Sequence, residues 1–172
     1  MQQVIFIILL GVVAYFATKG FLRIRRNILL GKDEIINDQK SVRLNNVLLI
    51  AFGQKKMFKR FIPAIFHFFI YAAFILTQIE LIEIIIDGIA GTHRIFAPYL
   101  GGFYTFLLNF IEFLSLLAFI ATIVFLTRRN IIRLPRFKSS DLNGWPRLDA
   151  NLILLGEILL IVGIFCMNGA DG

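Results

Sequence analysis

Four long apolar runs divide the chain, and the polar residues gather between them. The runs cover residues 4–22, 61–86, 102–126 and 151–167. Each run approaches the roughly 20 residues that an α-helix needs to cross a hydrocarbon core of about 30 Å. The sequence therefore predicts an all-α integral membrane protein, in which residues 1–172 form a single membrane domain built as a bundle of four transmembrane helices.

The composition supports a membrane protein over a soluble one. Hydrophobic residues make up 58% of the 172 residues and charged residues 17%, and 19 residues are phenylalanine. The mean hydropathy is +0.80. Soluble domains average about 45–50% apolar and about 25% charged residues. Because a water-soluble fold of this length would not bury so much apolar surface, the composition argues against disorder, solenoids and soluble enzymes.

The basic residues indicate the orientation of the helices. The formal net charge is +7, but the Lys and Arg side chains flank the apolar runs, so no nucleic-acid partner is expected. Counting Lys19 at the end of the first run, 17 of the 18 lie between the first and second runs or between the third and fourth, and Arg94 is the exception. By the positive-inside rule these two segments are cytoplasmic and the N-terminus lies outside. The first run lacks a preceding basic stretch, so it is predicted to be a retained helix and not a signal peptide.

The two basic segments differ in character. In the first, apolar residues between positions 42 and 52 precede a run of cations, which predicts a short helix in the cytoplasmic membrane interface. The cations are Lys55, Lys56, Lys59 and Arg60. Such a helix either docks a partner or anionic lipid, or is a basic turn that only sets the topology; both interpretations stay open. The second segment, residues 127–150, is predicted to be irregular because it contains prolines and a glycine.

His67 is the sharpest candidate for a cofactor ligand. It lies six residues inside the cytoplasmic end of the second predicted helix, or about 9 Å at 1.5 Å per residue. Ionisable groups inside a bilayer are costly, so each is a functional candidate. A neutral imidazole is a good axial ligand for haem iron, and Ala64, Ala72 and Ala73 leave room beside it among several phenylalanines. The alternative is a histidine that only forms hydrogen bonds between helices.

A second group of candidates lies near the outer end of the same helix. Glu80, Glu83 and Asp87 follow the helical spacing i, i+3, i+7. They are candidates for proton release, or they form a solvated helix end. His93 and Arg94 follow in the outer loop and are candidates for contacting a quinol head group, the alternative being exposed loop residues.

The cysteine and histidine counts limit the metal chemistry of this chain. Cys166 is the single cysteine, which excludes a disulfide within the chain and an iron–sulfur cluster held by this chain, because a cluster needs about four thiolates. Cys166 is predicted to be a small packing residue. With two histidines, a polyhistidine metal site is not expected either. Any metal bound through His67 is expected to be haem iron.

Three local patterns make the chain resemble the membrane cytochrome b subunit (gamma subunit) of respiratory nitrate reductase and the related membrane subunit of heterodisulfide reductases. The patterns are Arg23, Arg25 and Arg26 with Asn27–Gly31; the Phe66–His67 pair; and Arg128–Arg129, Pro135–Arg136 and Asp149 in that order. The chain is most similar to the membrane part at the N-terminus of bacterial iron–sulfur oxidoreductases related to heterodisulfide reductase.

This resemblance implies a function for the chain. It implies a multi-pass domain of the bacterial inner membrane that passes electrons from a quinol through a b-type haem, ligated by His67, to a cytoplasmic iron–sulfur domain or subunit. The chain is then part of a membrane-bound oxidoreductase and not a catalyst on its own. The alternative is a non-redox membrane anchor or assembly module for a respiratory complex.

The chain departs from the nitrate reductase pattern at two points. Thr77 stands where those proteins carry a second haem-ligating histidine, and the family draws partner histidines from a fifth helix, which would follow Gly172. The resemblance therefore implies that this chain is the N-terminal part of a longer protein and holds half of a haem site.

Overall fold

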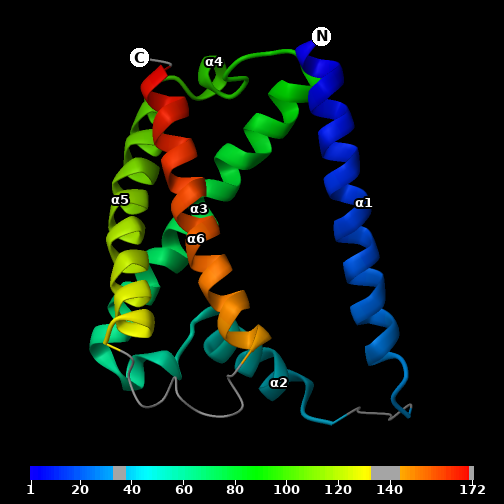
Figure 1. Ribbon diagram of the computed structural model, residues 1–172, viewed down its shortest axis with the longest axis vertical. Coiled ribbons are helices and arrows are strands. Elements are labelled where there is room, and N and C mark those ends of the chain that lie inside the picture. The colour runs from blue at the N-terminus through cyan, green and yellow to red at the C-terminus, as the bar shows by residue number, and fades with distance from the viewer. Residues whose placement is uncertain (33–37, 133–143, 171–172) are drawn as a thin grey trace. The chain divides into compact units, whose positions relative to one another are not determined.

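The described residues of the computed structural model, 1–32, 38–132 and 144–170, contain helices and no strand (Figure 1). The α-helices are α1 (Gln2–Ile28), α2 (Lys40–Asn46), α3 (Phe61–Ala90), α4 (Ala97–Leu100), α5 (Gly102–Asn130) and α6 (Trp145–Ala170). A π-helical segment (Val47–Phe52) follows α2, and a 3₁₀ turn (Met57–Lys59) precedes α3. Four of the helices are long and apolar enough to cross a membrane, which confirms the prediction of an all-α protein with four spanning helices.

The long helices extend beyond the apolar runs that predicted them. They contain 26 to 30 residues, which corresponds to about 40 Å at 1.5 Å per residue. Their ends include polar and basic residues, such as Arg25 and Arg26 in the last turn of α1 and Arg128 and Arg129 in that of α5. Cations at a helix C-terminus interact favourably with the helix dipole, so the helix continues after the apolar run has ended.

The connection between α5 and α6 is shorter than predicted. Of the range 127–150, which was expected to be irregular, the first residues belong to α5 and residues from Trp145 onward belong to α6. Gly144 precedes α6 with a φ of +80°, a backbone conformation that favours glycine. Pro146 lies in the first turn, where a missing N–H removes no helical hydrogen bond. Residues 133–143, including Pro135, lie outside the described residues.

The contacts divide the chain into two compact units, which share α3. The unit of residues 56–79 and 100–172 contains the first part of α3 together with α5 and α6, and Figure 1 shows α5 and α6 antiparallel and side by side. Its core is small: Ala73, Leu114, Ala118 and Ile161 are buried together. Ala73 therefore packs in a helix interface, and the expectation that it leaves room beside His67 was wrong.

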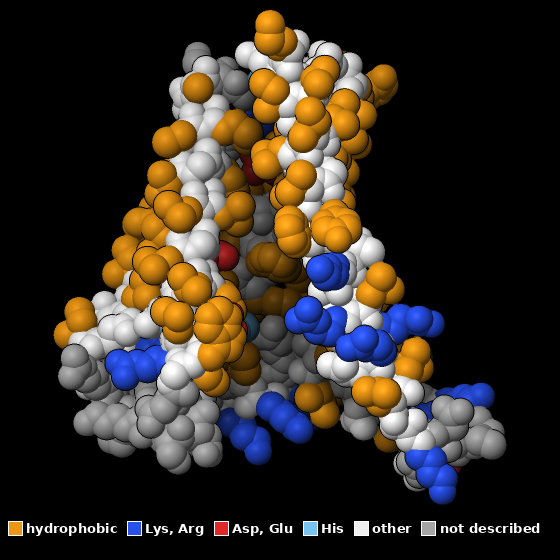
Figure 2. All heavy atoms as spheres, turned by 45° about the vertical axis from the view of Figure 1, so that its right-hand side comes forward, with side chains coloured by type: hydrophobic (Ala, Val, Ile, Leu, Met, Phe, Trp, Pro, Cys, Tyr) orange, Lys and Arg blue, Asp and Glu red, His pale blue; other side chains and the backbone are white. Residues whose placement is uncertain are grey.

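The other unit, residues 1–55 and 80–99, contains α1 and the last turns of α3. None of the residues of α1 is buried, and Figure 2 shows hydrophobic side chains along this helix with Lys and Arg toward one end. Its start meets the end of α3: a Cβ at Gly88 would lie 2.3 Å from Cε1 of Phe6, and one at Gly91 would lie 2.1 Å from the amide nitrogen of Gln3. Glycine at these positions permits the close approach.

The predicted interfacial segment between positions 42 and 52 is helical. It forms α2 and the π-helical segment, and its large apolar side chains are exposed. An exposed apolar helix with cations behind it is typical of a segment lying in the headgroup region. Its place in the interface and its partner stay predictions.

Candidate functional site

His67 lies near the start of α3 and lines a cavity of about 440 Å³. The cavity lies between α3, the segment that precedes it and α5. Its lining residues are Lys56, Met57, Lys59, Arg60, Pro63, Ala64, His67 and Phe125. Ala64, which is 1% exposed, lies one helical turn before His67, and its small side chain keeps this wall open. The prediction that Ala64 leaves space beside His67 is therefore confirmed.

The imidazole of His67 has an unsatisfied polar atom. The His67 side chain is half-buried, and its Nδ1 is buried without a hydrogen-bond partner among the residues that the structure describes. Most buried polar side-chain atoms have a partner, so such an atom calls for an explanation, for example a ligand. The neutral imidazole offers one N–H donor and one nitrogen lone pair, and the lone pair is the group that binds a metal.

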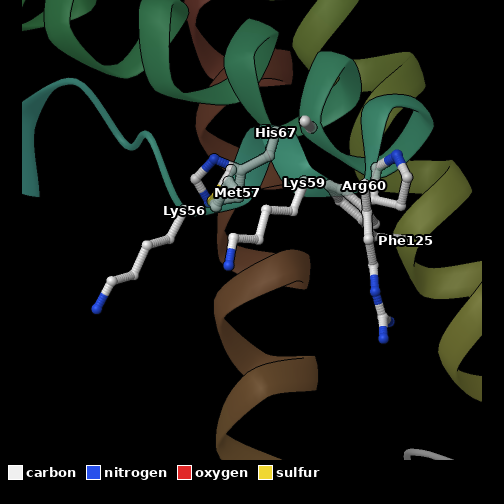
Figure 3. Close-up of a pocket in the computed structure, with 8 residues that line it drawn as sticks. Lys56, Met57, Lys59, Arg60, His67 and Phe125 are labelled. Atoms are coloured by element: carbon white, nitrogen blue, oxygen red, sulfur yellow. The ribbon is translucent and has the colours of Figure 1, made fainter. Parts of the chain in front are cut away.

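The walls of the cavity are apolar. Phe125 of α5 is one of them, and its ring packs edge-on against Phe66 with the centroids 6.4 Å apart. Met57 is half-buried, whereas Phe58 beside it is exposed, and Figure 3 shows the Met57 side chain beside the imidazole. Sequence reasoning did not find Met57. Its inward position follows from the 3₁₀ turn before α3, which no periodic pattern in the sequence marks.

The mouth of the cavity is cationic. Lys56, Lys59 and Arg60 line it and are exposed, and Figure 3 shows the three side chains extending from the segment before α3. The cavity therefore joins an apolar interior that contains one imidazole to a positively charged rim. This arrangement suits an amphipathic ligand with acidic groups at one end.

The carboxylates at the other end of α3 bind the segment that follows the helix. Glu80 Oε1 lies 3.7 Å from Nη1 of Arg94, and Glu83 Oε1 accepts a hydrogen bond of 2.9 Å from the Phe96 N–H. Asp87 accepts hydrogen bonds from the Thr92 hydroxyl (2.5 Å) and from the Arg94 N–H (2.7 Å). Together these contacts hold residues 92–96 against the last turns of α3.

The interpretation of these acidic residues as a solvated helix end was wrong. Glu80 and Glu83 are only 2% and 3% exposed. The spacing that suggested a common face was right, but the chain after α3 folds back on that face. Arg94 adopts a φ of +53°, which is unusual for a residue other than glycine, and its contacts with Asp87 and Glu80 hold it there. His93 is exposed, as the simpler interpretation of this residue expected.

The structure keeps the two groups of candidates apart. His67 belongs to the unit of residues 56–79 and 100–172, and Glu80 belongs to the other unit. Thr77, at the position of the second histidine in the nitrate reductase pattern, is buried and donates a hydrogen bond of 3.0 Å to the Phe74 carbonyl of its own helix. Cys166, predicted to be a small packing residue, is exposed on α6. No group of three or more metal-binding side chains occurs among the described residues.

One protein to which the chain is similar is named as an oxidoreductase. The chain is similar to the probable iron–sulfur-binding oxidoreductase FadF of Bacillus subtilis. The two are 32% identical over 135 residues, which is 78% of this chain and 18% of the relative. The chain thus spans about a fifth of the length of the curated relative that it matches. The similarity supports a membrane-type domain associated with an oxidoreductase.

No protein family model matches the chain, and no solved structure matches it.

Proposed function

We propose that the chain is the membrane electron-transfer domain of a bacterial membrane-bound iron–sulfur oxidoreductase. In this proposal a b-type haem ligated by His67 connects a quinol with a cytoplasmic iron–sulfur domain or subunit. The similarity to an iron–sulfur-binding oxidoreductase supports the redox association, and the four apolar helices support a place in the bacterial inner membrane. The finer resemblance to the nitrate reductase gamma subunit supports haem as the cofactor.

The unsatisfied imidazole nitrogen at the cavity is the observation that carries the proposal. The residues present fit a b-type haem: His67 offers a nitrogen to the iron, Ala64 leaves space for a flat ring, and Phe125 offers an aromatic wall. When bound, the haem would supply one-electron oxidation and reduction. The chain itself holds the haem, keeps water from it with apolar walls, and leaves further ligands to residues outside those that line the cavity.

The orientation of the helices follows from the basic residues and is part of the proposal. By the positive-inside rule, the distribution of 17 of the 18 Lys and Arg residues supports a cytoplasmic location for the cavity end of α3, where electrons would leave for an iron–sulfur partner. Topology reporters fused after Lys40 and after Lys138 are expected to report the cytoplasm, and one fused after Thr92 the outside. A cytoplasmic signal after Thr92 would contradict the proposed direction of transfer.

The quinol is proposed to bind at the outer end of α3. His93 is exposed on the segment that the α3 carboxylates hold, so it can reach a quinol hydroxyl and accept its proton. Arg94 and Glu80 form an ion pair beside it, and Glu83 binds the backbone of the same segment. In this proposal these three residues position the segment, and the carboxylates of Glu80 and Glu83 are the groups that can accept the proton that the quinol releases.

A reduced-minus-oxidised visible spectrum tests the haem. The wild-type protein, purified at the full length of its natural chain, is expected to show a b-type band, and His67→Ala is expected to abolish or shift it. Alanine is tolerated in a membrane helix, so insertion continues and serves as the check on the variant. His93→Ala is the matched control and is expected to keep the band.

A wild-type spectrum in His67→Ala would overturn the haem proposal. The alternative is then a non-redox membrane anchor or assembly module, in which His67 forms hydrogen bonds with neighbouring helices. One observation favours this alternative: Thr77 replaces the second histidine of the nitrate reductase pattern and satisfies its hydroxyl within its own helix.

A further inference from the structure

The rim of the cavity is positively charged. Lys56, Lys59 and Arg60 are the charged residues among those lining the cavity, and none of the lining residues is acidic. Among residues 1–32, 38–132 and 144–170, the structure records no ion pair for these three cations. The rim is thus a concentration of like charges at the mouth of an apolar space.

This arrangement favours an anion at the mouth of the cavity. Like charges near one another repel, and an anion bound at this rim lowers the repulsion and gains charge-assisted contacts. Arg60 can bind a carboxylate with two parallel N–H groups, and the lysines act as point charges. Because α3 begins at Phe61, directly after Arg60, its N-terminal amides add partial positive charge at the same place.

The ligand must also suit the interior. Beyond the rim lie apolar walls and the buried Nδ1 of His67. The acyl chain of a lipid would fill the apolar space but would leave the imidazole nitrogen without a partner. A flat apolar molecule with a metal ion at its centre and carboxylates at its edge provides a partner for both ends of the cavity.

We propose that Lys56, Lys59 and Arg60 form an anion clamp that binds the carboxylate groups of the cofactor held by His67. The inference rests on the proposed function: with haem b in the cavity, the clamp binds its propionates. The three cations then act as positioning residues. They orient the carboxylate edge of the cofactor toward the segment before α3. They also oppose dissociation of the cofactor through the apolar side of the cavity.

Haem b and its dimethyl ester, which lacks the free carboxylates, test the clamp directly. Both are titrated into the full-length protein stripped of haem, in nanodiscs of neutral lipid, and binding is followed by absorption. The wild-type protein is expected to bind haem about tenfold more tightly than the ester, which corresponds to about one charge-assisted contact. The double variant Lys59→Gln/Arg60→Gln is expected to bind the two compounds alike.

Lys55→Gln is the matched control. Lys55 is exposed in the same basic run but does not line the cavity, so this variant is expected to keep the wild-type preference for haem. The rim residues are exposed, and thermal unfolding of each variant checks that the fold is intact.

The outcomes separate the clamp from the haem site. A wild-type preference that persists in the double variant would overturn the clamp and leave the haem site standing. A double variant that binds haem normally but loses binding to vesicles of anionic lipid would assign the rim to lipid headgroups, which also overturns the clamp. Undiminished haem binding in His67→Ala would instead overturn the proposed function itself.

Discussion

The first turns of α3 and its last turns both carry titratable side chains, but their surroundings differ. At the last turns, Glu80 pairs with Arg94 and Glu83 accepts the Phe96 N–H. At the first turns, Nδ1 of His67 is buried without a partner among the described residues, and the neighbouring cations line an apolar cavity. The carboxylates in the last turns of this helix thus contact the chain itself, whereas Nδ1 of His67 in its first turns faces a cavity.

This difference separates a structural role from a binding role. A buried polar group without a partner costs about 1–3 kcal/mol, so a fold retains one where something else compensates. The carboxylates at the end of α3 contact residues of the chain itself, and these contacts order the segment 92–96. The imidazole at the start of α3 faces a cavity, and a ligand there supplies the missing contact.

Filling the cavity is expected to have the largest effect on haem binding and to act on the binding end alone. Ala64→Leu adds bulk to the cavity wall at a residue that is 1% exposed. The resulting overpacking costs about 1–3 kcal/mol, so haem occupancy is expected to fall by about tenfold or more. Haem absorption per protein measures the loss. Gly163→Leu is the control, because a Cβ at Gly163 meets nothing within 4 Å. Full haem content in Ala64→Leu would contradict the assignment of the cavity.

Removing the cation at the other end is expected to lower stability and spare the haem band. Arg94→Ala leaves the Glu80 carboxylate, whose side chain is 3% exposed, without its partner, and breaking such a pair costs about 3 kcal/mol of unfolding free energy. Unfolding in detergent measures the loss. Adding Glu80→Gln to Arg94→Ala is expected to recover part of it, because an amide needs no counter-charge. An unchanged stability of Arg94→Ala would show that the ion pair does not hold the segment.

The smallest effect on the free energy of unfolding is expected at the contact between α1 and α3. In Gly88→Ala, the new methyl group lies within 2.3–2.6 Å of the Phe6 ring, and the strain lowers the unfolding free energy by about 1 kcal/mol. Gly11→Ala, on an open face of α1, is expected to be neutral or slightly stabilising. The double variant with Phe6→Ala is expected to relieve the strain. A loss that persists in the double variant would contradict this contact.

Much of the fold could be predicted because its strongest signals are local. The four spanning helices follow from runs of apolar residues, and the helical segment after position 40 follows from an apolar cluster with cations behind it. His67 and Ala64 were also identified correctly as neighbours, since residues three apart share a helix face. The exact helix ends were missed, because polar residues such as Arg26 continue a helix beyond its apolar part.

The surroundings of the polar residues required the three-dimensional structure. Glu80 and Glu83 look like a solvated helix end until the segment after α3 folds back over them. Met57 gives no signal in the sequence, and only the turn before α3 brings it to the cavity.

The sequence by itself determined that this is an all-α membrane protein with four spanning helices. The reason is that the free energy of placing a helix in hydrocarbon is nearly a sum over its own residues. Only the tertiary structure decided which polar side chains are satisfied and which line a cavity. Those contacts join residues distant in the chain, such as Phe125 with His67 in the lining of the cavity, and they depend on how turns reverse and helices pack.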